Sequence, residues 1–101
     1  MPRYILKPDP AEDFYVYWST VVESPIGWGD RKTMEAEWPN EMATERFERA
    51  DATGSSSMDR FFEWGDNWIY EQKGFVGHAQ LKTMCERKER MEPVLDLVRP
   101  L

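Results

Sequence analysis

The longest regular pattern of apolar and polar positions runs from Phe14 to Glu23 and predicts a β-strand. Alternation places Phe14, Val16, Trp18, Thr20 and Val22 on one face, and Tyr15, Tyr17, Ser19, Val21 and Glu23 on the other. β-Branched and aromatic residues dominate the run, and both kinds are enriched in strands. Bulky side chains on both faces are typical of a strand that is covered on both sides. We therefore expect a central strand that ends before Pro25.

A shorter apolar run, Tyr4-Ile5-Leu6, precedes this strand and is separated from it by Pro8-Asp9-Pro10. Proline cannot donate a hydrogen bond to a β-ladder, so this triplet favours a turn. The two runs are therefore predicted to form a hairpin with a long connection.

The next segments are predicted to be a loop, Ser24–Gly29, and two helices. Asp30 is a favourable N-cap for a helix from Arg31 to Trp38, which Pro39 ends. Asn40 is expected to cap the second helix, which Gly54 ends. Its apolar stripe is narrow, with the spacing i, i+4 and i+7, and consists of Ala43, Phe47 and Ala50.

A second hairpin is predicted from Phe61–Trp64 and Asn67–Glu71, because Gly65-Asp66 suits a type II′ turn. A loop between Gly74 and Gly77 follows, and then a helix from His78 to about Arg90. The apolar face of that helix holds Leu81, Met84 and Cys85, with Lys88 beside them. Pro93 ends the helix, and the apolar, β-branched run Val94–Val98 is predicted to be a closing strand.

The resulting order of elements is β-β-α-α-β-β-α-β. Strands that come in hairpin pairs favour an antiparallel sheet. We therefore expect one α+β domain over residues 1–101, with a single sheet of about five strands and helices mainly on one face.

The composition excludes some classes of protein. The chain has 101 residues and a formal net charge of −6, and it carries five Trp, five Phe and four Tyr. That aromatic content is too high for a disordered acidic tail. The longest uncharged run, Phe14–Val22, has nine residues, too few to span a membrane. No basic start followed by an apolar segment opens the chain, so we expect no signal peptide.

The negative charge is concentrated in the middle of the chain. Thr33–Gln72 holds ten acids and three bases, a net charge of −7, while the remainder has nine acids and ten bases, a net charge of +1. Such a segment is expected to meet a partner with a basic surface, and it disfavours direct binding of nucleic acid. The alternative is that the acidic surface only keeps a small protein in solution.

Residues that could carry catalysis are few. Cys85 and His78 lie seven positions apart on one predicted helix, about 10.5 Å along its axis, too far for a histidine to activate a thiol. We expect Cys85 in the core and His78 as a capping or surface residue. One cysteine and one histidine are too few for a zinc site, so we expect no metal and no cofactor. The chain is therefore predicted not to be an enzyme.

Some acidic and glycine-rich segments admit two interpretations. The pairs Glu35 with Glu37, Glu41 with Glu45, and Glu63 with Asp66 fit acid–base chemistry, the binding of a hard cation, or a solvated surface, and the sequence favours the surface. Gly54-Ser55-Ser56-Ser57 and Gly27-Trp28-Gly29 lack the spacing of phosphate-binding loops and are interpreted as turns.

A core of this size cannot hide every aromatic ring, so some should be exposed for binding. Trp28 lies between two glycines, where no helix or strand pattern requires an aromatic residue. It is expected either to fold over the core or to face a partner. The candidate partner-binding residues are Trp28, Glu35, Glu37, Trp38, Trp64 and Asp66.

Four segments, taken in order, carry a resemblance. They are Tyr17-Trp18-Ser19-Thr20-Val21-Val22 with Pro25, Arg49-Ala50-Asp51-Ala52-Thr53-Gly54-Ser55, Tyr70-Glu71-Gln72-Lys73-Gly74-Phe75, and Val98-Arg99-Pro100. Together they resemble small uncharacterised proteins encoded by actinobacterial phages and prophages. The resemblance spans most of the chain and implies a phage protein that works in the bacterial cytoplasm. It implies no functional residues, because no active site belongs to that group.

We therefore expect a non-enzymatic, phage-encoded protein that binds and modulates a host protein through an aromatic and acidic surface. Two alternatives stay open: a module that binds or sequesters a small molecule or nucleotide, and a structural or assembly protein of the phage. A basic pocket would favour ligand binding, whereas a flat aromatic patch with an acidic rim would favour a protein partner.

Overall fold

A computed structural model describes residues 3–101 as a small α+β fold, as predicted. Its elements, in chain order, are β1 (Arg3–Leu6), β2 (Tyr15–Ser19), β3 (Ser24–Gly29), α1 (Arg31–Glu37), α2 (Thr44–Thr53), β4 (Asn67–Tyr70), β5 (Gly74–Gly77), α3 (His78–Glu89), the 3₁₀ helix η1 (Leu95–Leu97) and β6 (Arg99–Pro100). They form two three-stranded sheets, β1-β2-β3 and β4-β5-β6, both antiparallel. The prediction of one sheet of about five strands is therefore wrong.

Strand β2 is the centre of the first sheet, as expected, and all five of its residues are buried. It ends at Ser19 rather than Glu23, because the chain turns and returns as β3. The predicted loop Ser24–Gly29 is this third strand. Pro25 and the glycines are tolerated because β3 is an edge strand whose register with β2 shifts between Tyr17 and Trp18.

The second sheet differs from the predicted hairpin. Strand β4 pairs with β5 through a turn in which Glu71 and Gln72 adopt left-handed backbone angles. The predicted strand Phe61–Trp64 is instead irregular, and Phe62 has a φ of 63°. Polar side chains bind its backbone amides: the Ser57 hydroxyl accepts from the amide of Phe61 and the Asp66 carboxylate accepts from that of Glu63. Such local bonds compete with strand pairing.

The predicted closing strand Val94–Val98 is also wrong, because Leu95–Leu97 forms the 3₁₀ helix. The closing strand is the short β6 that follows, and Gly74 allows it to approach β5. A Cβ atom at Gly74 would lie 2.2 Å from the carbonyl oxygen of Arg99.

The helices agree more closely with the sequence. The Asp30 carboxylate caps α1 by accepting from the Thr33 amide at 2.7 Å. Helix α2 ends at Gly54, which has a φ of 94°, but its N-cap is Ala43 rather than Asn40. Ala43 is exposed, so the predicted apolar stripe is reduced to Phe47 and Ala50. Helix α3 begins at His78 as predicted and buries Leu81, Met84 and Cys85.

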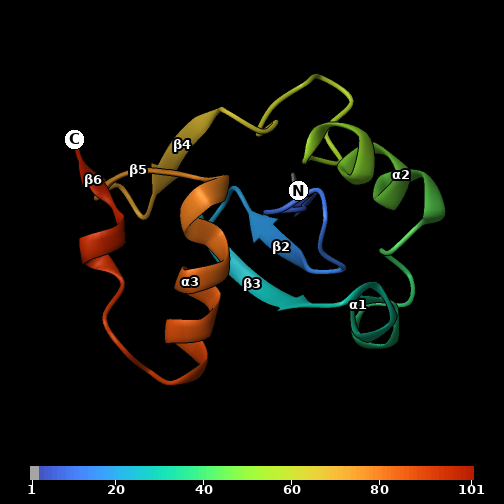
Figure 1. Cartoon of the computed structure of the whole chain (residues 1–101), viewed down its shortest axis with the longest axis horizontal. Helices are drawn as coiled ribbons and strands as arrows, with labels where there is room; N and C mark the ends of the chain where they lie inside the picture. The colour runs from blue at the N-terminus through green and yellow to red at the C-terminus, as the bar shows by residue number, and fades with distance from the viewer. Residues whose placement is uncertain (1–2) are drawn as a thin grey trace.

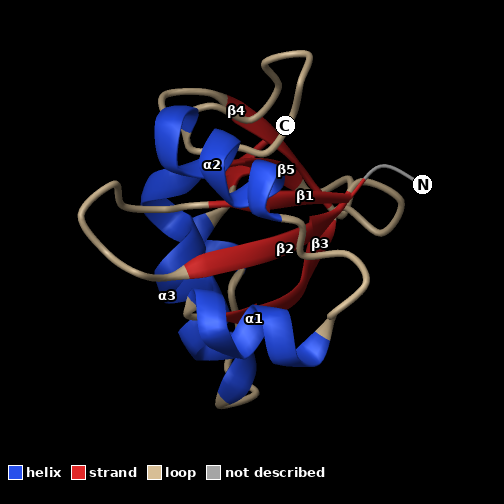
Figure 2. Cartoon of the chain, turned by 90° about the vertical axis from the view of Figure 1, so that its right-hand side faces the viewer, coloured by secondary structure: helices blue, strands red, loops and turns tan. Residues whose placement is uncertain are grey.

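The first sheet lies between two layers. One face, with Val16 and Trp18, packs against α3 and the second sheet, and the opposite face, with Tyr15 and Tyr17, packs against α1 and α2. Figure 1 shows α3 on one side of β2 and β3 with α1 and α2 on the other, and Figure 2 shows the first sheet from the side of α1 and α2. Helices therefore cover both faces, and not mainly one.

Candidate functional site

The predicted partner-binding residues do not form one patch. Trp28 and Trp38 lie on opposite faces of the first sheet, because Trp28 packs against the cluster of Val16 and Trp38 against that of Tyr17. Trp64 and Asp66 belong to the separate segment that precedes β4. The structure thus divides the six residues into three groups.

Trp28 is half-buried over the core. Its indole Nε1 donates to Oε1 of Glu89 on α3 at 2.7 Å. This hydrogen bond fixes the ring between β3 and α3. Part of the ring stays exposed to solvent.

Trp38 and the α1 acids form the second group. Trp38 is half-buried, with its ring centroid 5.4 Å from that of Tyr17 and its six-membered ring above Gly27. Glu35 and Glu37 are exposed on α1, whose C-cap is Trp38. The Arg31 guanidinium pairs with the Glu35 carboxylate at 3.6 Å. Here an aromatic ring and two carboxylates lie close together in the chain, and we call Glu35, Glu37 and Trp38 the α1 surface.

Trp64 and Asp66 form the third group. Trp64 Nε1 donates to the Lys7 carbonyl oxygen at 2.7 Å, and its ring covers Gly54. This contact ties the segment before β4 to the chain that follows β1. Asp66 is exposed, and its carboxylate accepts from the amide of Glu63.

Cys85 lies in the core, as predicted. It is buried and free, and burial raises the pKa of its thiol to about 12. A thiol with that pKa is protonated at neutral pH and is a poor nucleophile. The prediction for His78 is wrong: its side chain is buried rather than at the surface, and Nε2 donates to the carbonyl oxygen of Gly54 at 2.8 Å.

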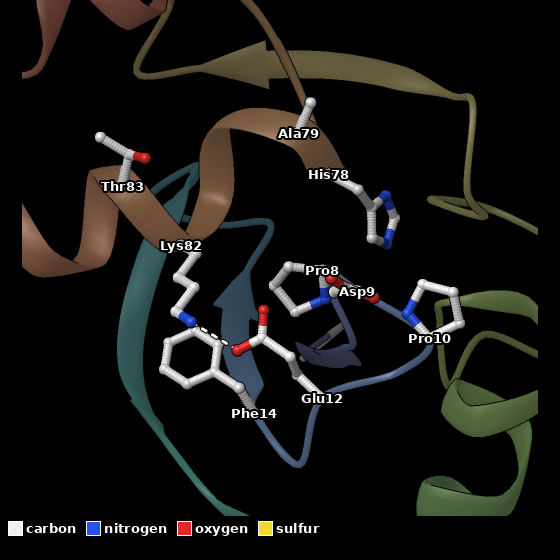
Figure 3. Close-up of a pocket in the computed structure, with 9 residues that line it drawn as sticks. All are labelled: Pro8, Asp9, Pro10, Glu12, Phe14, His78, Ala79, Lys82 and Thr83. Carbon is white, nitrogen blue, oxygen red and sulfur yellow. Dashed lines mark hydrogen bonds and ion pairs between the residues drawn. The ribbon is translucent and has the colours of Figure 1, made fainter.

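A pocket of about 320 Å³ lies between the loop after β1 and the first turns of α3. Figure 3 shows Pro8, Pro10 and Phe14 facing His78 and Lys82 across it. The Lys82 ammonium pairs with Glu12 and lies 5.8 Å from the centroid of the Phe14 ring. The hydrogen bond with Glu12 is the largest cause that raises the pKa of Lys82. The negative charges of Glu86 and Asp9 raise this pKa further. The pocket is therefore not basic.

A second pocket, of about 250 Å³, is basic and lies where α2 meets β1. Three arginines line it, Arg3 from β1 and Arg46 and Arg49 from α2, together with Tyr4, Ser57 and Asp59. We call this the arginine recess. An open groove of about 700 Å³ continues from it and shares Arg3 and Arg46.

Backbone carbonyls hold two of these guanidinium groups in place. Arg46 donates to the carbonyl oxygens of Glu41, at 2.9 Å, and of Arg3. Arg49 Nε donates to the Ser56 carbonyl oxygen at 2.7 Å. Arg3 makes a longer contact, 3.5 Å from its Nη1 to Oε1 of Glu41.

Little in the sequence pattern indicates the recess. Arg3 is 43 residues from Arg46, and only the docking of α2 on β1 brings the two together. One signal was present: Arg46 and Arg49 are two of the three bases in the acidic segment Thr33–Gln72, and their i, i+3 spacing places them on one helix face.

Comparison with protein-family models, curated proteins and solved structures found no match to this chain. Among residues 3–101, no helix has the length and apolar character needed to cross a bilayer. In the same part of the chain, no three His, Cys, Asp or Glu side chains gather as metal ligands.

Proposed function

We propose that this chain is a non-enzymatic binding protein, encoded by a phage, that engages and modulates a protein of the bacterial host in its cytoplasm. The observation that carries the proposal is the α1 surface, where Glu35 and Glu37 are exposed on α1 and the half-buried Trp38 follows directly at its C-terminal end. Aromatic residues supply much of the energy of protein interfaces, and charges around them steer association. A partner with a basic surface fits this combination.

The character of Cys85 and His78 supports a role without catalysis. The Cys85 thiol is held protonated by burial, and the Nε2 proton of His78 is committed to a backbone carbonyl. The thiol is therefore a poor nucleophile, and the second ring nitrogen of His78, Nδ1, is buried away from solvent.

The proposal is tested by affinity capture from a lysate of the bacterial host, with the wild-type chain and a Glu35→Lys/Glu37→Lys variant as baits. We expect a host protein that the wild type captures and the variant loses. Glu86→Lys/Glu92→Lys, which makes the same charge change at exposed positions outside the acidic segment, is the matched control and should retain the partner. Equal capture by all three baits would contradict a role for the α1 surface.

A second function, the binding of a small molecule or nucleotide, is favoured by one specific observation, the arginine recess. A basic pocket is the feature that distinguishes a ligand-binding module from a protein that only meets a partner. The two functions rest on different residues, so each can be tested with its own variants.

A further inference from the structure

We infer that the arginine recess binds a phosphate group, carried by a small ester such as a nucleotide. The inference rests on the second proposed function and specifies its ligand. Guanidinium groups present planar pairs of N–H donors that match the oxygens of phosphate. Three such groups converge on one pocket from two elements, β1 and α2.

The local charge of the recess is opposite to that of the protein. Counting Arg3, Arg46 and Arg49 against Glu41 and Asp59, the recess and its groove carry a net charge of +1. The whole chain carries −6. Salt screens charges that lie farther than about 8–10 Å from the recess, so the charges of its lining residues weigh most on an ion bound there.

The structural roles of these arginines leave donors for a ligand. A guanidinium has five N–H groups. Among the described contacts, Arg46 uses two nitrogens, and Arg49 and Arg3 use one each. Because backbone carbonyls already fix Arg46 and Arg49, a ligand would bind them with little further loss of side-chain entropy.

The wall beside the arginines suits the organic part of an ester. Tyr4 is half-buried and is supported by Phe62, with ring centroids 5.1 Å apart. Met58 is 80% exposed at the same recess. An aromatic face next to a cationic site can stack a base while the arginines hold its phosphate. The Ser57 hydroxyl accepts from the amides of Asp59 and Phe61, so its own proton is available to a phosphate oxygen.

The test is a titration with inorganic phosphate, adenosine monophosphate and adenosine, followed by calorimetry and by the Nε–H resonances of the arginines in nuclear magnetic resonance spectra. We expect phosphate and the nucleotide to shift the Arg46 and Arg49 resonances in a saturable way, and adenosine not to do so. Tighter binding of the nucleotide would identify an ester as the ligand, whereas equal binding would identify free phosphate. Both results support a phosphate site, and equal binding would overturn the assignment of an ester.

Two pairs of variants keep the test independent of general charge effects. Arg3→Gln should weaken phosphate binding about tenfold, as expected for loss of a charge-assisted hydrogen bond, while Arg60→Gln, which makes the same charge change outside the recess, should not. Asp59→Asn should strengthen binding and Asp66→Asn should leave it unchanged. Arg3 and Asp59 are not fully buried, and melting curves verify that the variants fold.

Three results would overturn the inference. They are unshifted Arg46 and Arg49 resonances, equal weakening by Arg3→Gln and Arg60→Gln, and binding of adenosine as tight as that of its monophosphate. The last result would leave the ligand-binding function standing, with another part of the molecule as its site. None of the three bears on partner binding through the α1 surface.

Discussion

His78 is the buried ionisable residue whose surroundings differ most from the prediction. Its side chain is 6% exposed and meets the Trp68 ring edge-on, with centroids 5.1 Å apart. Nε2 donates to Gly54, and the buried Nδ1 has no hydrogen-bond partner within residues 3–101. Desolvation lowers the pKa of His78, against smaller opposing effects of the Gly54 carbonyl and the Asp66 charge. The folded chain therefore favours the neutral imidazole.

This environment predicts that stability depends on pH. The pKa of His78 is lower in the folded than in the unfolded chain, so the unfolded state binds the proton more readily as the pH falls. The contribution of His78 to the free energy of unfolding should be constant above about pH 7 and should fall as the pH drops below the unfolded pKa of about 6.5. Urea unfolding at pH 7.5 and pH 5.5 measures this change. His78→Gln, which keeps a donor for Gly54, should show a smaller change, and an equal change in both proteins would contradict the assignment.

Strand β2 is the element on which both halves of the core depend. Its residues alternate between two buried clusters. One cluster lies between the first sheet, α3 and the second sheet, and the other lies between the first sheet, α1 and α2. Val16 is fully buried in the first cluster. Val21 and Val22, in contrast, are 56% and 53% exposed in the turn that follows the strand.

Two substitutions of the same kind test where this strand ends. Val16→Asp places an unpaired charge in the core and should cost about 4 kcal/mol or more, a large share of the stability of a small domain. Val21→Asp should change stability by less than about 0.5 kcal/mol, because its side chain is exposed in a turn. Thermal melting followed by circular dichroism measures both. A cooperative transition at the wild-type temperature for Val16→Asp would show that β2 is misplaced.

The elements that the sequence predicted well are those with a strong local signal. The N-cap Asp30, the stop at Gly54 and the apolar face of α3 all act within a few residues, and the structure has all three. Strands β3 and β5 were missed because glycine and proline normally disfavour strands, and here pairing with β2 and β4 overrides that preference. A short apolar run such as Val94–Val98 does not distinguish a strand from a 3₁₀ turn.

The candidate sites depended more on tertiary structure than the elements did. Sequence alone could identify Trp28 and Trp38 as unusual, but only the fold shows that they lie on opposite faces of one sheet. The arginine recess requires α2 to dock on β1, and no local pattern encodes that contact. Contacts between side chains that are distant in the chain could therefore not be predicted from the sequence.

At the scale of the whole molecule, charge separates the two proposed functions. Two of the three bases in the acidic segment line the arginine recess, so the remaining surface of that segment is more acidic than the composition indicates. The α1 surface belongs to this acidic part, and its carboxylates would act on a partner through their long-range field. Such a field raises the rate of association more than it slows dissociation.

The most direct test of partner binding is therefore the association rate, measured by surface plasmon resonance with the captured partner at two salt concentrations. For the wild-type chain we expect association to slow markedly as salt rises, because screening weakens the steering. Glu35→Lys/Glu37→Lys should associate more slowly than the wild type at low salt and should respond less to added salt, with Glu86→Lys/Glu92→Lys close to the wild type. Wild-type association rates and salt dependence for the α1 variant would contradict the proposal that this surface meets a basic partner.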